Sequence, residues 1–183
     1  MTTNSASNRD LLITAITQFD NVLRAAAASS AHNSTPCADY DLTGLVAHVT
    51  VVVDRLAQTL GTPKTYQDGD PDWASARDQA LHAIATADPG KTVTLPFGTM
   101  PAQAAFGVLL GELATHGWDL AVAIDRTDLL DQTLGTAAAS LVSARIPEHP
   151  RDGMPFGPVI PVAADAPPYD RLAEWMGRDP AWC

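Results

Sequence analysis

Apolar residues recur at intervals of three and four along most of the chain, and this period limits the available folds more than any other feature. Between residues 8 and 30 the apolar side chains that follow it are Leu11, Leu12, Ala15, Ile16, Phe19, Val22, Leu23 and Ala26. Such a period places one face of an α-helix in a protein core. Similar stretches predict further helices at 41–60, 72–86, 101–124, 131–144 and 169–177. We therefore expect an all-α protein, built as a bundle of four main helices with extensions.

Proline separates the expected bundle from the rest of the chain. Seven of the 14 prolines fall between Pro147 and Pro168. Proline lacks an amide hydrogen and disrupts helix interiors, so this stretch is expected to be an extended excursion. We predict a helical bundle over residues 1–145 and a proline-rich extension over 146–183, which carries the short terminal helix and packs on the same domain. Alternating residues at 91–95 allow one short strand before the fourth long helix.

Composition and charge narrow the classes of function. The 183 residues are 46% hydrophobic, which is enough for one domain with its own core. The chain has 21 acidic and 11 basic residues and no basic patch, so no nucleic-acid partner is expected. No apolar run approaches the ~20 residues of a membrane span, and no signal peptide is visible. Two cysteines form no disulfide framework, and we expect a cytoplasmic protein without a membrane partner.

The fourth long helix carries the residues that point to chemistry. On a helical wheel, Glu112, His116 and Asp119 lie within about 100° of one another, on a stripe otherwise made of small and apolar residues. Glu112 and His116 have Cβ atoms roughly 5–6 Å apart, close enough to bind one ion. The alternative is a Glu–His pair on a solvent-exposed face, because ion-pair networks resemble metal sites. Asp119, one turn further on, could orient the His116 imidazole as an outer partner.

A third ligand candidate, His48, lies on the second helix. It stands at the edge of the apolar face formed by Leu45, Val49 and Val52. Taken alone, such a histidine is more often a core imidazole that is hydrogen-bonded to a backbone carbonyl. If the second and fourth helices are neighbours, two histidines and one carboxylate would form a site with open positions, as in catalytic zinc sites. Helix bundles build such sites from side chains on facing helices.

The remaining candidates have weaker support. Cys37 precedes the second helix, whose dipole could favour a thiolate, although a buried inert thiol is the more common state. His32, His82 and His149 lie in polar or loop settings without a matching partner. The sequence contains no phosphate-binding loop, dinucleotide fingerprint, nucleophile elbow or Cys-x-x-Cys motif. The sequence therefore assigns no catalytic residue.

Several segments resemble a known family. Residues 35–49, which contain His48, and residues 95–101 followed by 112–121 resemble the two signatures of mycothiol-dependent maleylpyruvate isomerase-like proteins. These proteins belong to the DinB-like metal-binding superfamily. C-terminal segments such as Gly177-Arg178-Asp179-Pro180 look like one subfamily of that group. The resemblance covers most of the chain, and its specific part is the histidine of the first signature with the Glu-x-x-x-His of the second.

The resemblance implies a DinB-like four-helix bundle that holds a divalent metal, usually Zn²⁺ or Ni²⁺, through three side chains. Matched by motif, these ligands are His48, Glu112 and His116. It also implies a low-molecular-weight thiol such as mycothiol as cofactor, an electrophilic small-molecule substrate and, in many relatives, a homodimer. We expect the chain to differ from the isomerase itself, because residues 146–183 are too few for a separate C-terminal domain of comparable size.

Two functional hypotheses follow. In the first, the protein is a metal-dependent thiol transferase or isomerase-like enzyme, in which the metal binds the thiol as a thiolate beside an electrophile. Arg55, two helical turns after His48, is the best local candidate to bind an anionic thiol cofactor, and its alternative is an exposed arginine. In the second hypothesis, the protein is a non-enzymatic metal-binding stress or sensor protein. A metal-free bundle is a third option, which the resemblance disfavours.

Overall fold

The computed structural model describes residues 7–27, 29, 34–64, 69, 71–96 and 98–182, and most of them are helical. These residues form six α-helices, one 3₁₀ helix and one two-stranded sheet. The elements are α1 (Asn8–Ala26), α2 (Leu42–Leu60), α3 (Trp73–Thr86), β1 (Thr92–Leu95), β2 (Gly98–Pro101), α4 (Ala102–Ala123), η1 (Thr127–Leu129), α5 (Gln132–Ser143) and α6 (Pro168–Trp175). The prediction of a mostly helical protein is confirmed.

A short hairpin corrects one detail of that prediction. The sequence predicts one short strand at 91–95, whereas the structure has two: β1 pairs antiparallel with β2, with Thr92 opposite Pro101 and Leu95 opposite Gly98. Pro101 ends β2 and is the N-cap of α4, with φ −61° and ψ 146°, so it does not lie inside the first helical turn. Because proline has no amide hydrogen to donate, it fits the end of a short strand as well as a helix start.

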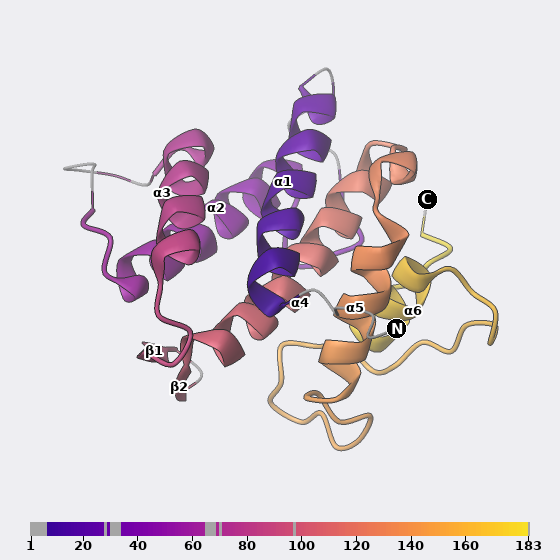
Figure 1. Cartoon of the computed structure of the whole chain (residues 1–183). Helices are drawn as coiled ribbons and strands as arrows, with labels where there is room; N and C mark the ends of the chain where they lie inside the picture. Colours follow the sequence, from indigo (N-terminus) through magenta and orange to yellow (C-terminus); the bar gives the residue numbers. More distant parts are fainter. Residues whose placement is uncertain are drawn as a thin grey trace, which may run out of the picture.

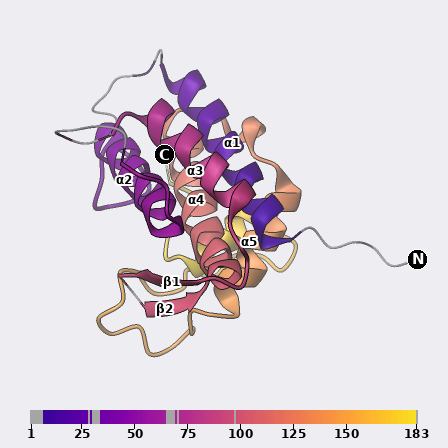
Figure 2. The ribbon, with the colours of Figure 1, turned by 60° about the vertical axis from the view of Figure 1, so that its left-hand side comes forward.

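Helix α4 lies at the centre of the molecule and contacts α1, α2, α5, α6 and both strands. Figure 1 shows α2 and α3 on one side of α4, and α5 and α6 on the other. Figure 2, in which the molecule is turned by 60°, shows the hairpin at one end of the helices. Most residues of α4 between Ala105 and Ala121 are buried, so neighbours cover this helix on all sides. No helix in the described ranges combines the length and apolarity needed to cross a bilayer.

Small residues let the neighbouring helices approach α4 closely. A Cβ atom added at Gly111 would lie 2.7 Å from Cγ1 of Val142 on α5. One added at Gly107 would lie 2.8 Å from Nδ2 of Asn8 on α1. A larger side chain at Gly111 would press on Val142 of α5, and one at Gly107 would have to displace the ends of the Asn8 and Arg145 side chains.

Capping residues define both ends of α2, the helix that carries His48. Asp41 caps the start of the helix, where its Oδ1 accepts a hydrogen bond of 2.7 Å from the Gly44 amide. Gly61 ends the helix in a left-handed conformation with φ 106°, which glycine adopts without strain. The turn that carries His48 faces α4, where its Nε2 lies 2.9 Å from Oε1 of Glu112.

The segment between α5 and α6 is tied to the residues that follow α6. Residues 147–166 form no helix or strand. Nη1 of Arg151 donates hydrogen bonds of 2.7 Å to the carbonyl oxygens of both Gly157 and Trp175. Gly177 has φ 71°, and a Cβ atom there would lie 2.6 Å from Cα of Gly157. The two backbones therefore cross in direct contact.

Candidate metal centre

Three side chains from two helices converge beside α4. His48 of α2 and His116 of α4 both direct Nε2 at the carboxylate of Glu112. The distances to Oε1 are 2.9 Å from His48 and 3.3 Å from His116. The two imidazole centroids lie 5.1 Å apart, with the ring planes at 80°. The structure thus brings together the three residues that the sequence indicated as ligands.

Each imidazole also has a partner on its other nitrogen. Nδ1 of His116 lies 2.9 Å from Oδ2 of Asp119, and Nδ1 of His48 lies 3.2 Å from the hydroxyl of Tyr40. Because an ionised carboxylate can only accept, His116 donates from Nδ1 and turns Nε2 toward Glu112. Metal-binding histidines are oriented in the same way by a carboxylate, a backbone carbonyl or a water behind the ring. Asp119 therefore lies where the sequence analysis expected an outer partner.

The cluster is buried at one end and open at the other. The Asp119 side chain is fully buried, and that of His116 is 7% exposed. The side chains of His48 and Glu112 are 29% and 28% exposed. A small molecule from solvent can therefore reach the His48 and Glu112 end without displacing the core.

Burial and hydrogen bonding act against each other on the pKa values of this cluster. Burial alone would raise the pKa of Glu112, but hydrogen bonds from His116 and His48 lower it well below its ordinary value. Burial alone would lower the pKa of His116, but hydrogen bonds to Asp119 and Glu112 raise it to about 9. Without a metal, the cluster thus stabilises the positively charged form of His116 between the carboxylates of Glu112 and Asp119.

The donor atoms fit a divalent metal. In tetrahedral zinc sites the nitrogen and oxygen ligands lie about 2.0–2.2 Å from the metal, so two of them are roughly 3.3–3.5 Å apart. The separations of 2.9 Å and 3.3 Å from the two imidazoles to Glu112 Oε1 are close to that range. The ligand atoms of His48, Glu112 and His116 all lie within 4.8 Å of one another. Two imidazole nitrogens and one carboxylate oxygen are donors that several divalent metals accept, and they leave at least one position for another molecule.

A second group of potential ligands lies behind His116. Cys37, His116 and Asp119 are all buried, and each offers a ligand atom within 4.8 Å of the others. Burial and the Asp119 charge raise the pKa of the Cys37 thiol. The guanidinium of Arg178 contacts this group, with Nη2 3.4 Å from Cys37 Sγ and 3.4 Å from Asp119 Oδ2. Sequence reasoning missed the roles of Arg178 and Tyr40, although both lie in segments that carry the family resemblance.

The other sequence candidates lie away from the cluster. Arg55 is exposed on α2 and forms no ion pair with the described residues, so it does not join the site. His82 is exposed, and the side chain of His149 is 78% exposed. His32 and Cys183 lie outside the described residues.

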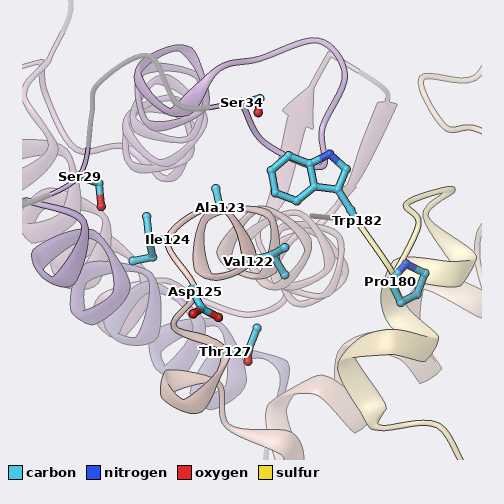
Figure 3. A pocket seen from close by; sticks show the side chains of 9 residues that line it. All are labelled: Ser29, Ser34, Val122, Ala123, Ile124, Asp125, Thr127, Pro180 and Trp182. Atoms are coloured by element: carbon cyan, nitrogen blue, oxygen red, sulfur yellow. The ribbon is translucent and has the colours of Figure 1, made fainter.

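A cleft of about 670 Å³ lies at the C-terminal end of α4. Its lining is formed by Ser29, Ser34, Val122, Ala123, Ile124, Asp125, Thr127, Pro180 and Trp182 (Figure 3). None of the three converging ligands lines this cleft. Because polar chemistry is concentrated at Glu112 and the two imidazoles, we place the candidate functional site there and not in the cleft.

Fold and cluster together define a mostly helical protein with buried side-chain groups that could hold a metal ion. No protein-family model matches the sequence, and no solved structure matches it. Two proteins from two strains of Mycobacterium tuberculosis, the uncharacterized proteins MT0763 and Rv0738, are each 31% identical to the chain over 151 residues. These matches cover 79% of this chain and 82% of each relative. The chain belongs to the family of these mycobacterial proteins.

Proposed function

We propose that the protein binds one divalent metal, zinc first and nickel second, through His48, Glu112 and His116. The observation that carries this proposal is the convergence of two imidazole Nε2 atoms on one carboxylate oxygen, at 2.9 Å and 3.3 Å. The contacts of Nδ1 of His48 with the Tyr40 hydroxyl and of Nδ1 of His116 with Asp119 support it further, because they leave Nε2 of both rings to face the ion. The arrangement matches what the resemblance to DinB-like four-helix bundles implies.

We further propose that the protein uses this site as a thiol transferase or isomerase-like enzyme. Three protein ligands leave a position open, whereas structural zinc is usually closed by four. A divalent metal bound there supplies a positive charge that lowers the pKa of a thiol such as mycothiol. Glu112, His48 and His116 hold the ion, while Tyr40 and Asp119 orient the imidazoles. The partly exposed end at His48 and Glu112 gives the thiol and an electrophilic substrate access from solvent.

One observation favours the alternative of a non-enzymatic metal-binding protein. An anionic thiol cofactor needs a cationic partner at the open end of the site. Glu112 forms ion pairs with His48 and His116, and with no arginine or lysine among the described residues. Arg178 contacts the cluster from its buried end, through Asp119 and Cys37. This favours a stress or sensor role in which the ion is retained and no cofactor is bound.

Metal analysis and thiol binding separate these functions. Untagged protein, purified without added metal, is expected to carry one divalent ion per chain. In a cobalt-substituted Cys37→Ser, Cys183→Ser protein, a transferase is expected to show a sulfur-to-cobalt charge-transfer band when mycothiol is added. It should also consume a test electrophile in a thiol-dependent reaction that Glu112→Ala abolishes. A bound ion whose spectrum no small thiol changes, without turnover, would establish the non-enzymatic alternative.

A further inference from the structure

We propose that Arg178 is a positioning residue that reserves His116 for the ligand group His48–Glu112–His116. Its guanidinium acts as a built-in cation in the second group, formed by Cys37, His116 and Asp119, and so keeps a metal out of that group. This inference rests on the proposed metal-binding function and concerns the choice between two ligand groups that share one imidazole.

The two groups share His116 but use opposite nitrogens of its ring. Nε2 faces Glu112 at 3.3 Å, whereas Nδ1 faces Asp119 at 2.9 Å. The second group is the more buried, and it offers a thiol, an imidazole nitrogen and a carboxylate oxygen. Zinc and cobalt bind this donor set, and thiolate is among their preferred ligands. By composition alone, the second group is therefore an equally good metal site.

Arg178 changes that balance because it already contacts the second group. Its Nε and Nη2 lie 3.4 Å from the two oxygens of Asp119, and Nη2 lies 3.4 Å from Cys37 Sγ. The side chain is only 10% exposed. A guanidinium stays protonated in proteins, so this positive charge is permanent. A divalent ion among the same atoms would meet a fixed like charge within a few ångströms.

The backbone holds Arg178 in this place from several directions. Its amide donates a hydrogen bond of 2.9 Å to the Ala173 carbonyl oxygen. Its Nη1 donates another, also of 2.9 Å, to the Met176 carbonyl oxygen. The preceding residue, Gly177, lies in direct contact with Gly157. The guanidinium is therefore directed at the second group by a segment that has little freedom to move. While Asp119 is paired with Arg178, its carboxylate accepts a hydrogen bond from Nδ1 of His116. The other ring nitrogen, Nε2, then remains available to the group formed with His48 and Glu112.

Cobalt spectra of Arg178 variants test this inference. In a Cys183→Ser protein, where Cys37 is the only thiol, loaded cobalt is expected to show no sulfur-to-cobalt charge-transfer band. Arg178→Met keeps the length of the side chain and removes the charge, so this variant should gain such a band. The band should vanish when Cys37→Ser is added. Arg178→Lys retains the positive charge and is the matched control, expected to keep the parent spectrum.

Two results would overturn the inference. One is a folded Arg178→Met protein whose cobalt spectrum equals that of the parent, and the other is a Cys37-dependent band in the parent itself.

A second measurement needs no variant at Arg178. Nitrogen-15 spectra of the histidines in the zinc-loaded protein are expected to show His116 bound through Nε2, with a hydrogen on Nδ1. Binding through Nδ1 would refute the role assigned to Arg178.

These outcomes are distinct from failure of the proposed function. If the parent binds no metal, or if His48→Ala leaves binding unchanged, the site at His48, Glu112 and His116 is wrong. If the parent binds metal there but Arg178→Met gains no cysteine ligand, only the inference about Arg178 is wrong.

Discussion

Asp119 Oδ2 lies 2.9 Å from Nδ1 of His116, one helical turn earlier, and both side chains are buried. A carboxylate behind an imidazole fixes the orientation of the ring and makes the far nitrogen a stronger ligand. That far nitrogen faces Glu112 and, across it, His48 from another helix.

Replacement of either imidazole ligand should remove most of the metal. His48→Ala and His116→Ala each leave only two protein ligands, which hold an ion far less tightly than three. Metal content per chain after dialysis measures the effect. His82→Ala and His149→Ala are matched controls on exposed histidines and should retain their metal. Near-stoichiometric metal in both ligand variants would refute the site.

Removal of the Tyr40 hydroxyl should weaken metal binding without abolishing it. Tyr40→Phe keeps the ring, which is stacked on His48 with centroids 4.8 Å apart, and deletes only the hydrogen bond to Nδ1. Loss of such an outer partner typically reduces metal affinity by about 10- to 100-fold. Competition with a chelator gives the dissociation constant. An unchanged constant would show that the ring contact alone orients His48.

Protons should compete with the metal up to high pH. The pKa of His116 in the metal-free protein is raised to about 9, so at neutral pH this imidazole must lose a proton before it binds an ion. Apparent affinity should therefore increase by up to about tenfold per pH unit for one displaced proton, and level off above that pKa. Calorimetric titrations in buffers with different ionisation heats measure the protons released. Binding at pH 7 without proton release would contradict the expectation.

Asp20 should contribute to stability at neutral pH and lose that contribution in acid. It accepts hydrogen bonds of 2.8 Å from Trp73 Nε1 and Arg77 Nη1, and one of 2.9 Å from Arg24 Nε. Burial alone would raise the pKa of Asp20, but these bonds lower it below the ordinary value of 3.8. The stabilisation is thus present above pH 3.8 and lost as the pH falls through the lower folded value.

The test is Asp20→Asn, which we expect to reduce the free energy of unfolding by about 1.5–3 kcal/mol at pH 7, as for hydrogen bonds to charged groups. Urea unfolding at pH 7 and pH 3 should show the difference from wild type shrinking in acid. Asp128→Asn removes an exposed ion pair with Arg126 and serves as the control with little effect. An equal loss from both variants would contradict the role of burial.

Gly135 on α5 should tolerate no methyl group. A Cβ atom there would lie 2.6 Å from Cδ2 of Tyr169, whose ring is buried under α5. Overpacking costs about 1–3 kcal/mol, which opposes the gain of about 1 kcal/mol that alanine brings to a helix interior. We expect Gly135→Ala to lower the melting temperature, while Thr136→Ala, on an exposed position of the same helix, changes it little. A stabilised Gly135→Ala would show that α6 can move away.

The sequence predicted the parts of this molecule that depend on local periodicity. A helical wheel places Glu112, His116 and Asp119 on one stripe, because residues three and four apart share a face. A helical wheel describes one helix and does not predict that α2 faces α4. His48 was therefore a ligand candidate only on the condition that these two helices are neighbours. Asp41 and Gly61 define the ends of α2 through their own backbone preferences, which are also local.

Contacts between distant segments could not be predicted in this way. Arg178 and Asp119 are separated by 59 residues, and no repeat or motif connects them. Arg55 follows His48 by seven residues, which is nearly two helical turns, but the two positions differ by about 20° on an ideal helix. Since His48 already lies at the edge of the apolar face, that rotation leaves Arg55 exposed. The arginine nearest the cluster therefore comes from the segment after α6.

The separation of the ligands along the chain has a consequence for folding. His48 and Glu112 are 64 residues apart in the sequence. An ion that bridges them closes a loop of that length, and an unfolded chain loses much entropy when it brings such distant residues together. The ion should thus bind the native chain far more tightly than the denatured one. Each tenfold rise in free metal above its dissociation constant should then add about 1.4 kcal/mol to stability, so the midpoint of thermal unfolding should keep rising with the free metal concentration.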